Sequence, residues 1–114
     1  MDATELILLY DYYGELLTQR QKECFELRYN QDLSLGEIGL ELGISRQGVF
    51  DNLSRTEALL RNMEEKTGCV RRDRRCRHAV GDIIQYAQLL TQFDDPRIAD
   101  LAQKIVEAAR ELEE

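Results

Sequence analysis

The stretch that decides the fold runs from Leu35 to Ser54, with the sequence LGEIGLELGISRQGVFDNLS. Its pattern is typical of a helix-turn-helix, in which two short helices pack at a steep angle across a tight turn. Gly39 stands where the two helices need a small residue to approach each other, and Gly43 stands where the turn needs a positive φ. The positions that such a unit buries are all aliphatic: Ile38, Leu42, Ile44, Val49 and Leu53. These matches predict two helices that meet at Gly43.

Capping patterns mark the helix starts upstream of the turn. Thr18 with Gln21, and Ser34 with Glu37, have the spacing of a capping box, which opens a helix. We therefore expect one helix from Thr18 to about Tyr29, then a polar loop, and then the first helix of the helix-turn-helix after Ser34.

Another helix is expected before the first capping box. Apolar residues recur there at intervals of three and four, which is the spacing of one helix face. We expect Tyr10 and Tyr13 to lie in the core, and Tyr12 to lie at its rim or in a subunit contact. The expected stripe is Leu6, Leu9, Tyr10, Tyr13, Leu16 and Leu17.

The second helix of the helix-turn-helix should begin after Ser45 and continue for about five turns, until Gly68 ends it. The segment from Val70 to His78 comes next, and a fifth helix is expected to follow it. The residues expected to face inward from that helix are Val80, Ile83, Ile84, Ala87 and Leu90.

A last helix is expected at the C-terminal end. Asp95 can cap it and Pro96 can be its first residue, because proline is well suited to the first turn. Its apolar seam would pack against the fifth helix or against a second copy of the chain. We expect a homodimer, which would also hold two helix-turn-helix units at a fixed spacing. The seam consists of Ile98, Leu101, Ile105, Ala108 and Leu112.

Composition favours an all-α protein. One Pro and seven Gly are too few turn residues for an all-β sandwich, and no apolar run reaches the ~18 residues of a membrane span. The acidic start lacks the basic region of a secretory signal, and three cysteines do not make a disulfide framework. We therefore expect a cytoplasmic protein with reduced thiols and no membrane insertion.

Nothing in the sequence predicts an enzyme. Cys69, Cys76 and His78 do not have the spacing of a zinc site, and a fourth ligand is missing. The glycine motifs that bind nucleotide phosphates do not occur, and no nucleophile stands in a recognisable acid–base pattern. We expect no catalytic residues, no cofactor and no metal.

Charge is distributed unevenly along the chain, which carries a net charge of −7. Residues 1–33 carry −4, residues 34–61 carry −1, residues 62–80 carry +3 and residues 81–114 carry −5. An acidic protein is a poor partner for a phosphate polyanion unless its positive charge is concentrated. Any nucleic-acid contact should therefore involve the nearly neutral helix-turn-helix or the positive segment after it.

Two pairs of stretches carry family resemblances. LTQRQKECFELRY (residues 17–29) with LSLGEIG (residues 33–39) resembles the fourth conserved region of bacterial sigma factors, whose helix-turn-helix reads a promoter element. YDYYGELLT (residues 10–18) and SRQGVFDNLSRTE (residues 45–57) resemble the YlxM-type helix-turn-helix proteins. That resemblance implies a short, all-helical cytoplasmic protein. Because the family's genes tend to lie beside those for the signal recognition particle and its receptor, it also implies a regulatory or accessory role in that pathway.

The second helix of the helix-turn-helix presents a candidate DNA-binding face. Arg46 can bind guanine and Gln47 can bind adenine, while Arg55 and the N-terminal serine can hold phosphates. Asp51 would be repelled by phosphates unless it met a cytosine amino group, and Phe50 suits a protein contact as well as a thymine methyl. A DNA reader and a protein–protein adaptor therefore both remain as hypotheses. The candidate face is Ser45, Arg46, Gln47, Phe50, Asp51, Ser54 and Arg55.

The arginine segment, residues 71–77, is a second candidate site. Its arginines could bind RNA or DNA phosphates or an acidic protein, which gives a third hypothesis, an RNA-binding accessory protein. The alternative is a solvated junction between helices that neutralises the flanking acids. The arginines are Arg71, Arg72, Arg74, Arg75 and Arg77.

Together these patterns predict an all-α fold. Residues 1–68 are expected to form a helix-turn-helix domain similar to the fourth region of sigma factors, and residues 69–114 a C-terminal helical extension. The expected partners are DNA, components of the signal recognition particle and a second copy of the chain.

Overall fold

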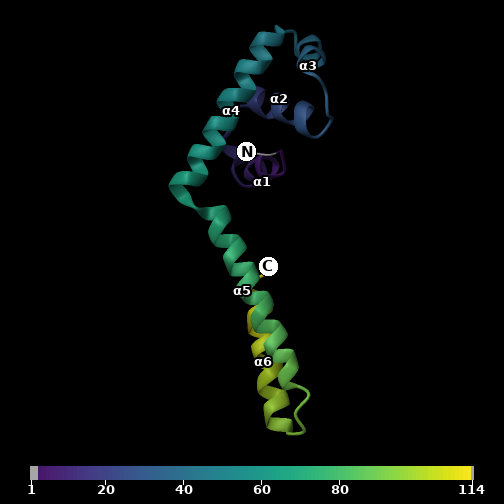
Figure 1. The fold of residues 1–114 in the computed structure, drawn as a ribbon, viewed down its shortest axis with the longest axis vertical. Helices are drawn as coiled ribbons and strands as arrows, with labels where there is room; N and C mark the ends of the chain where they lie inside the picture. Colours follow the sequence, from purple (N-terminus) through teal and green to yellow (C-terminus); the bar gives the residue numbers. More distant parts are fainter. Residues whose placement is uncertain (1–2, 114) are drawn as a thin grey trace. The chain divides into compact units, whose positions relative to one another are not determined.

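The computed structural model describes residues 3–113, and α-helices carry most of them (Figure 1). No strand occurs within that range, so the predicted all-α class is confirmed. Contacts divide the chain into a first unit, which ends at Val70, and a second unit, which begins at Arg71. In chain order the elements are α1 (Ala3–Tyr13), the 3-10 turn η1 (Gly14–Leu16), α2 (Gln19–Tyr29), α3 (Leu35–Leu42), α4 (Arg46–Thr67), α5 (Cys69–Leu90) and α6 (Pro96–Glu111).

Both predicted capping boxes are present. The Thr18 Oγ1 accepts a hydrogen bond from the backbone N–H of Gln21, and the Gln21 side chain accepts one from the backbone N–H of Thr18. Ser34 and Glu37 form the same pair of bonds at the start of α3. Ser45 caps α4 by accepting a hydrogen bond from the backbone N–H of residue 48, at 2.9 Å. These bonds fix where α2, α3 and α4 begin.

The turn between α3 and α4 depends on two glycines, as predicted. Gly43 has a φ of +72°, a conformation in which a Cβ atom is strained. A Cβ atom on Gly39 would lie 2.7 Å from the backbone oxygen of Ile44, so this position has no room for a side chain. Gly68 ends α4 with a φ of +62°. The close approach of the two helices therefore requires both Gly39 and Gly43.

The first unit has two hydrophobic clusters that share α4. Leu60 of α4 lies in the first cluster, whose other buried members include Leu9 of α1 and Phe25 of α2. Val49 and Leu53 of α4 lie in the second cluster, with Cys24 and Ile38. The helix that starts at Ser45 is thus the element around which α1, α2 and α3 pack, and its opposite side is left for other contacts.

Leu16 departs from the predicted apolar stripe. The α-helical turns of α1 end at Tyr13, and the tighter 3-10 turn that follows rotates the later side chains out of the α-helical register. Leu16 is therefore 69% exposed, whereas Leu17 is buried. Tyr13 lies in the core as expected, Tyr10 is half-buried against Phe25, and Tyr12 is exposed at the rim.

The arginine segment was expected to precede the fifth helix, and that expectation is wrong. α5 already begins at Cys69, so residues 71–77 form its first turns. Arginine is a good helix former, and the segment contains no Gly or Pro that would delay the helix start. Gly68 instead provides the break between α4 and α5.

The second unit is a hairpin in which α6 returns alongside α5 (Figure 1). The predicted start of the last helix at Asp95 and Pro96 is confirmed. Asp95 caps α6 by accepting a hydrogen bond from the backbone N–H of Arg97 at 2.9 Å, and Pro96 is the first helical residue. The loop between the two helices therefore ends at Asp95.

The inward faces of this hairpin differ from the predicted ones. Ile83 and Leu90 were expected to face inward but are 44% and 38% exposed. The predicted seam of α6 likewise leaves Leu101, Ile105 and Leu112 exposed. Small side chains are buried instead. The buried residues are Val80, Ala87, Ala102, Val106 and Ala109.

None of the helices in residues 3–113 has the length and apolar character that would let it cross a lipid bilayer.

Candidate nucleic-acid interface

The two sides of α4 differ in what they contact. Val49 and Leu53 are buried in the second hydrophobic cluster, together with Ile38 of α3. All seven residues that the sequence predicted for the interface are exposed. Five of them lie on other sides of the helix, whereas Ser45 and Arg46 lie at its start, in line with Val49. The seven residues are Ser45, Arg46, Gln47, Phe50, Asp51, Ser54 and Arg55. The predicted residues are therefore accessible along the first three turns of one helix.

The turn holds this face in a fixed position relative to α2 and α3. The backbone N–H of Ile44 donates a hydrogen bond to the oxygen of Gly39 at 3.0 Å, across the contact that needs no side chain at Gly39. Arg20 of α2 donates to the backbone oxygen of Leu42, at the end of α3, at 3.4 Å. These two bonds hold the end of α3 and the turn that leads into α4.

Side chains on the face are already partly arranged. The Nε2 of Gln47 donates a hydrogen bond to Oδ1 of Asp51 at 3.1 Å, one turn further along α4. This bond orients the glutamine amide. It also gives one oxygen of the Asp51 carboxylate a hydrogen-bond donor within the chain. The Ser45 hydroxyl accepts the capping bond and keeps its own hydrogen available to donate to an oxygen.

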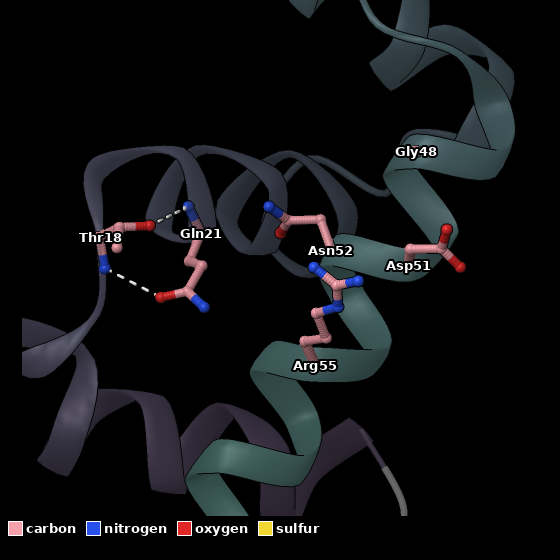
Figure 2. A pocket seen from close by; sticks show the side chains of 6 residues that line it. All are labelled: Thr18, Gln21, Gly48, Asp51, Asn52 and Arg55. Atoms are coloured by element: carbon pink, nitrogen blue, oxygen red, sulfur yellow. Dashed lines mark hydrogen bonds between the residues drawn. The ribbon is translucent and has the colours of Figure 1, made fainter.

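A pocket of about 370 Å³ lies between this face and the start of α2 (Figure 2). In Figure 2, Asn52 points toward the start of α2, the Arg55 side chain runs along α4 toward Asn52, and Asp51 points away from the start of α2. The lining residues are Thr18, Gln21, Gly48, Asp51, Asn52 and Arg55. Sequence reasoning assigned only Asp51 and Arg55 of these to the interface.

The chemistry of this pocket suits an anionic oxygen. The N-terminus of α2 carries the positive end of a helix dipole, and the Arg55 guanidinium adds a full charge. Asn52 turns toward the same space, and its Oδ1 is buried without a hydrogen-bond partner among the described residues. A phosphate group could therefore contact Arg55 and the start of α2, with a water or donor group satisfying Asn52.

The capping box at Thr18 and Gln21 was the sequence signal for the start of α2. It marks a positive helix end, but it does not show that this end lies beside α4. That adjacency depends on how α2 packs, so Thr18, Gln21 and Asn52 could not be assigned to the site from the sequence.

Tyrosine–glutamate hydrogen bonds join α4 to the helices behind it. The Tyr29 hydroxyl of α2 donates to Oε1 of Glu57, and burial together with this bond raises the pKa of Tyr29 to about 12. The Tyr13 hydroxyl donates to Oε1 of Glu64 at 2.7 Å, and burial raises its pKa as well. The same Glu64 oxygen accepts from the backbone N–H of Val70 at 3.0 Å. These bonds hold α4 along its length.

The arginine segment lies in the second unit, where its five arginines are exposed on the first turns of α5. Arg77 forms an ion pair with Asp73 at 3.1 Å, one turn earlier on the same helix. The segment therefore combines several positive charges with one internal acid, and its arginines can reach different directions around the helix.

Within residues 3–113, no group of three His, Cys, Asp or Glu side chains is placed to hold a metal ion. Cys24 is buried, Cys69 is half-buried and Cys76 is exposed. Burial raises the pKa of the Cys24 thiol, which disfavours the reactive thiolate.

Comparison with known proteins agrees with the helix-turn-helix geometry. Residues 1–100 match the family model UPF0122, described as "Putative helix-turn-helix protein, YlxM / p13 like". A UPF0122 protein of Thermoanaerobacter sp. (strain X514) is 44% identical over 99% of this chain and 95% of its own length. A UPF0122 protein of Acetivibrio thermocellus is 58% identical over 58% of this chain and 56% of its own length. The chain belongs to the UPF0122 family, which is described as a helix-turn-helix family.

Proposed function

We propose that this member of the UPF0122 family is a non-enzymatic regulator that binds double-stranded DNA through the face of α4 that begins at Ser45. The observation that carries the proposal is the division of α4 into a buried side and an exposed polar side. In DNA-binding helix-turn-helix units, the second helix enters the major groove with its N-terminal residues toward the base edges.

The first turn of α4 would supply sequence recognition. Arg46 is exposed there, and its guanidinium can form two parallel hydrogen bonds with guanine. Gln47 can bind adenine if it releases Asp51, or the Gln47–Asp51 pair can present the Asp51 carboxylate to a cytosine amino group. The aspartate would then select bases rather than repel DNA as a whole.

Phosphate contacts would set the position of the helix in the groove. Ser45 can donate its hydroxyl hydrogen, and Arg55 lies in the pocket that α4 shares with the positive end of α2. Thr18 and Gln21, at that helix end, would then lie close to the DNA backbone. The acidic flanks of the chain limit such contacts to this region, which favours a short, specific interface.

In vitro selection of duplexes from a random pool, followed by fluorescence anisotropy, tests this function. We expect a preferred site and a loss of discrimination at one base pair in Arg46→Ala, worth about 1–3 kcal/mol. Arg61→Ala is the matched control, because Arg61 is also exposed on α4 but lies 15 residues, roughly 22 Å, beyond Arg46. Equal affinity for unrelated duplexes would contradict the proposal, as would equal losses in both variants.

A protein–protein adaptor is the second candidate function. Phe50 is 52% exposed on the same face, and an exposed aromatic ring is more typical of protein contacts than of DNA phosphate contacts. An adaptor would lose its partner on Phe50→Ala or Asp51→Arg while never binding DNA. A pull-down with and without nuclease treatment separates these functions, because a protein partner survives the nuclease and a nucleic-acid partner does not.

The arginine segment supports a further candidate, an RNA-binding accessory protein. Five exposed arginines on two turns of α5 can bind phosphates of a nucleic acid. Replacing Arg71, Arg72, Arg74 and Arg75 by alanine should then remove a salt-sensitive RNA affinity. Because the chain resembles YlxM-type proteins, we propose that its regulatory role belongs to the signal recognition particle pathway. The RNA of that particle is therefore the RNA to use in the binding measurement.

We also propose that the functional form is a homodimer, with residues 1–68 as the DNA-binding domain and residues 69–114 as an extension. Two copies would hold two α4 helices at a fixed spacing, so the selected DNA site should contain two half-sites. Cytoplasmic localisation follows from the same function.

A further inference from the structure

The second unit has an unusual distribution of side chains. Its buried residues are small, namely alanines and valines, whereas eight of its large apolar residues are exposed. Leu101 and Leu112 of α6 are 59% and 64% exposed, and Tyr86 of α5 is 65% exposed. Contacts between α5 and α6 therefore bury fewer of the hairpin's apolar side chains than they leave exposed or half-exposed.

Each helix of the hairpin has two apolar faces. At about 100° per residue, the exposed residues of α5 are centred roughly 90° around the helix from the buried Val80 and Ala87. The exposed residues of α6 are likewise centred roughly 90° from the buried Ala102, Val106 and Ala109. The exposed residues of these second faces are Ile83, Tyr86 and Leu90 on α5, and Leu101, Ile105 and Leu112 on α6, while Leu89 is exposed on another side of α5.

The exposed faces of both helices lie on the same side of the hairpin. Ile105 of α6 lines an open groove of about 340 Å³ together with Ile83, Tyr86 and Leu90 of α5. The six exposed residues therefore form one apolar surface across both helices, which we call the hairpin face. Two apolar faces at right angles on every helix are the pattern of a four-helix bundle, in which each helix packs against two neighbours.

We propose that the hairpin face binds the hairpin face of a second copy of this chain, so that two hairpins form a four-helix bundle. The missing half of the bundle must itself be a helical hairpin with an apolar face, and the chain provides one in every other copy. A two-fold dimer pairs the same surface on both subunits. The six side chains expose on the order of 500 Å² per copy, which approaches the ~800 Å² per partner of a stable interface once their neighbours are included.

Charge favours an antiparallel arrangement of the two hairpins. The loop end carries Asp94 and the ion pairs Asp95–Arg97 and Asp100–Lys104. The other end carries the arginine segment together with Glu107 and Glu111 of α6, and its net charge is the more positive of the two. Parallel hairpins would bring ten arginines to one end and the aspartates of both copies to the other. Antiparallel hairpins instead place the arginines of one copy beside Asp94 of the other, which favours that orientation.

This interface deepens the proposed function, because it would hold two α4 helices in one particle. Self-association itself needs no DNA, so its failure and the failure of DNA binding are separate results. A monomer that binds a single half-site would overturn the interface and leave DNA binding intact. A dimer that binds no duplex would support the interface and contradict DNA binding.

Sedimentation equilibrium of the full chain tests the proposal. We expect a dimer at micromolar concentration, and at least a hundredfold weaker association in Ile83→Asp and in Ile105→Asp, because each buries a carboxylate in the interface. Leu89→Asp is the matched control. Leu89 is 50% exposed on α5 but lies about 90° further around the helix from the hairpin face, so this variant should remain dimeric.

Helical circular dichroism checks that each variant folds, since all three positions are exposed and no buried side chain is removed. A wild-type monomer at high micromolar concentration would overturn the proposal. So would dimers of unchanged strength in Ile83→Asp, or equal weakening in Leu89→Asp. Even if a variant fails to fold, the molecular mass of the wild-type protein in solution shows whether the dimer forms.

A charge exchange tests the orientation. Arg75→Glu and Asp94→Arg should each weaken the antiparallel dimer severalfold, and the double variant should restore much of the loss. Additive losses in the double variant would contradict the antiparallel arrangement.

Discussion

The two units of this chain are both helical, yet they use their apolar residues in opposite ways. The largest fully buried side chains, Phe25, Ile38 and Leu60 among them, all belong to the first unit. Of the twelve exposed large hydrophobic residues among residues 3–113, four lie in the first unit and eight in the smaller second unit. The first unit therefore builds its own core, whereas the second presents the apolar surface of half a bundle.

This difference assigns different roles to the units. A unit with a complete core can present a rigid polar face, as α4 does with Arg46 and its neighbours. A unit with an open apolar face is suited to joining molecules. Variants that affect one unit and not the other therefore test the comparison.

The largest effect is expected at Phe25. Its ring is fully buried, stacked on Tyr10 at 4.3 Å and packed against Tyr29 at 4.5 Å between ring centroids. Phe25→Ala should lower the free energy of unfolding by about 3–5 kcal/mol, because it leaves a cavity in the first unit. Urea denaturation measures this loss. Phe93→Ala is the control in the second unit, where the ring is 61% exposed, and a loss there as large as at Phe25 would contradict the comparison.

The next effect is expected at the helix crossing. Gly39→Ala places a Cβ atom 2.7 Å from the Ile44 backbone oxygen, so α3 and α4 must move apart, at a cost of about 1–3 kcal/mol. Gly36→Ala on the same helix meets nothing within 4 Å and should stabilise the protein by up to about 1 kcal/mol. Thermal unfolding of both variants checks the opposite signs. Equal effects would show that α3 and α4 do not cross at Gly39.

Dilution should affect the second unit more than the first. If the hairpin face is covered by a second copy, tenfold dilution removes about 1.4 kcal/mol of stabilisation from the dimer. Hydrogen exchange at two protein concentrations measures this separately for each helix. Amides of α5 beyond the arginine segment and of α6 should exchange faster on dilution, while those of α2 and α4 should not. Uniform protection at both concentrations would contradict a shared interface.

The smallest effect is expected at Tyr29. The hydrogen bond from its hydroxyl to Glu57 should contribute about 1 kcal/mol to the free energy of unfolding at neutral pH. Its folded pKa of about 12 lies above the ordinary value of 10.0, so the folded state favours the neutral phenol. That contribution is complete below pH 10 and is lost as the pH rises toward 12. Tyr29→Phe should therefore be less stable than wild type at pH 7 and approach it in alkaline solution. An unchanged difference at both pH values would show that this pair does not titrate.

Much of the first unit could be predicted from the sequence because its signals are local. A capping box such as Thr18 with Gln21 contains both of its hydrogen-bonding partners within four residues. Gly39 and Gly43 are required by the geometry of one turn. Five of the seven candidate residues of α4 follow from helix periodicity once the buried side is known, and the other two follow from their place at the start of the helix.

The rest could not be predicted because it depends on packing between helices. Periodicity identifies apolar faces, but when a helix has two of them it does not say which one packs inside the hairpin. Leu101 and Ile105 formed the more obvious seam, whereas the small Ala102 and Ala109 are the residues that are buried. The pocket beside Arg55 also depends on the position of α2, which the sequence of α4 does not contain.

Titration of the nitrogen-15-labelled chain with the duplex recovered by in vitro selection tests the DNA-binding role of α4 most directly. Amide signals of residues 45–55 should shift or broaden, together with those of Thr18 and Gln21, while the signals of α6 stay in place. Failure to recover any preferred duplex, or changes confined to residues 71–77, would contradict DNA recognition by this face.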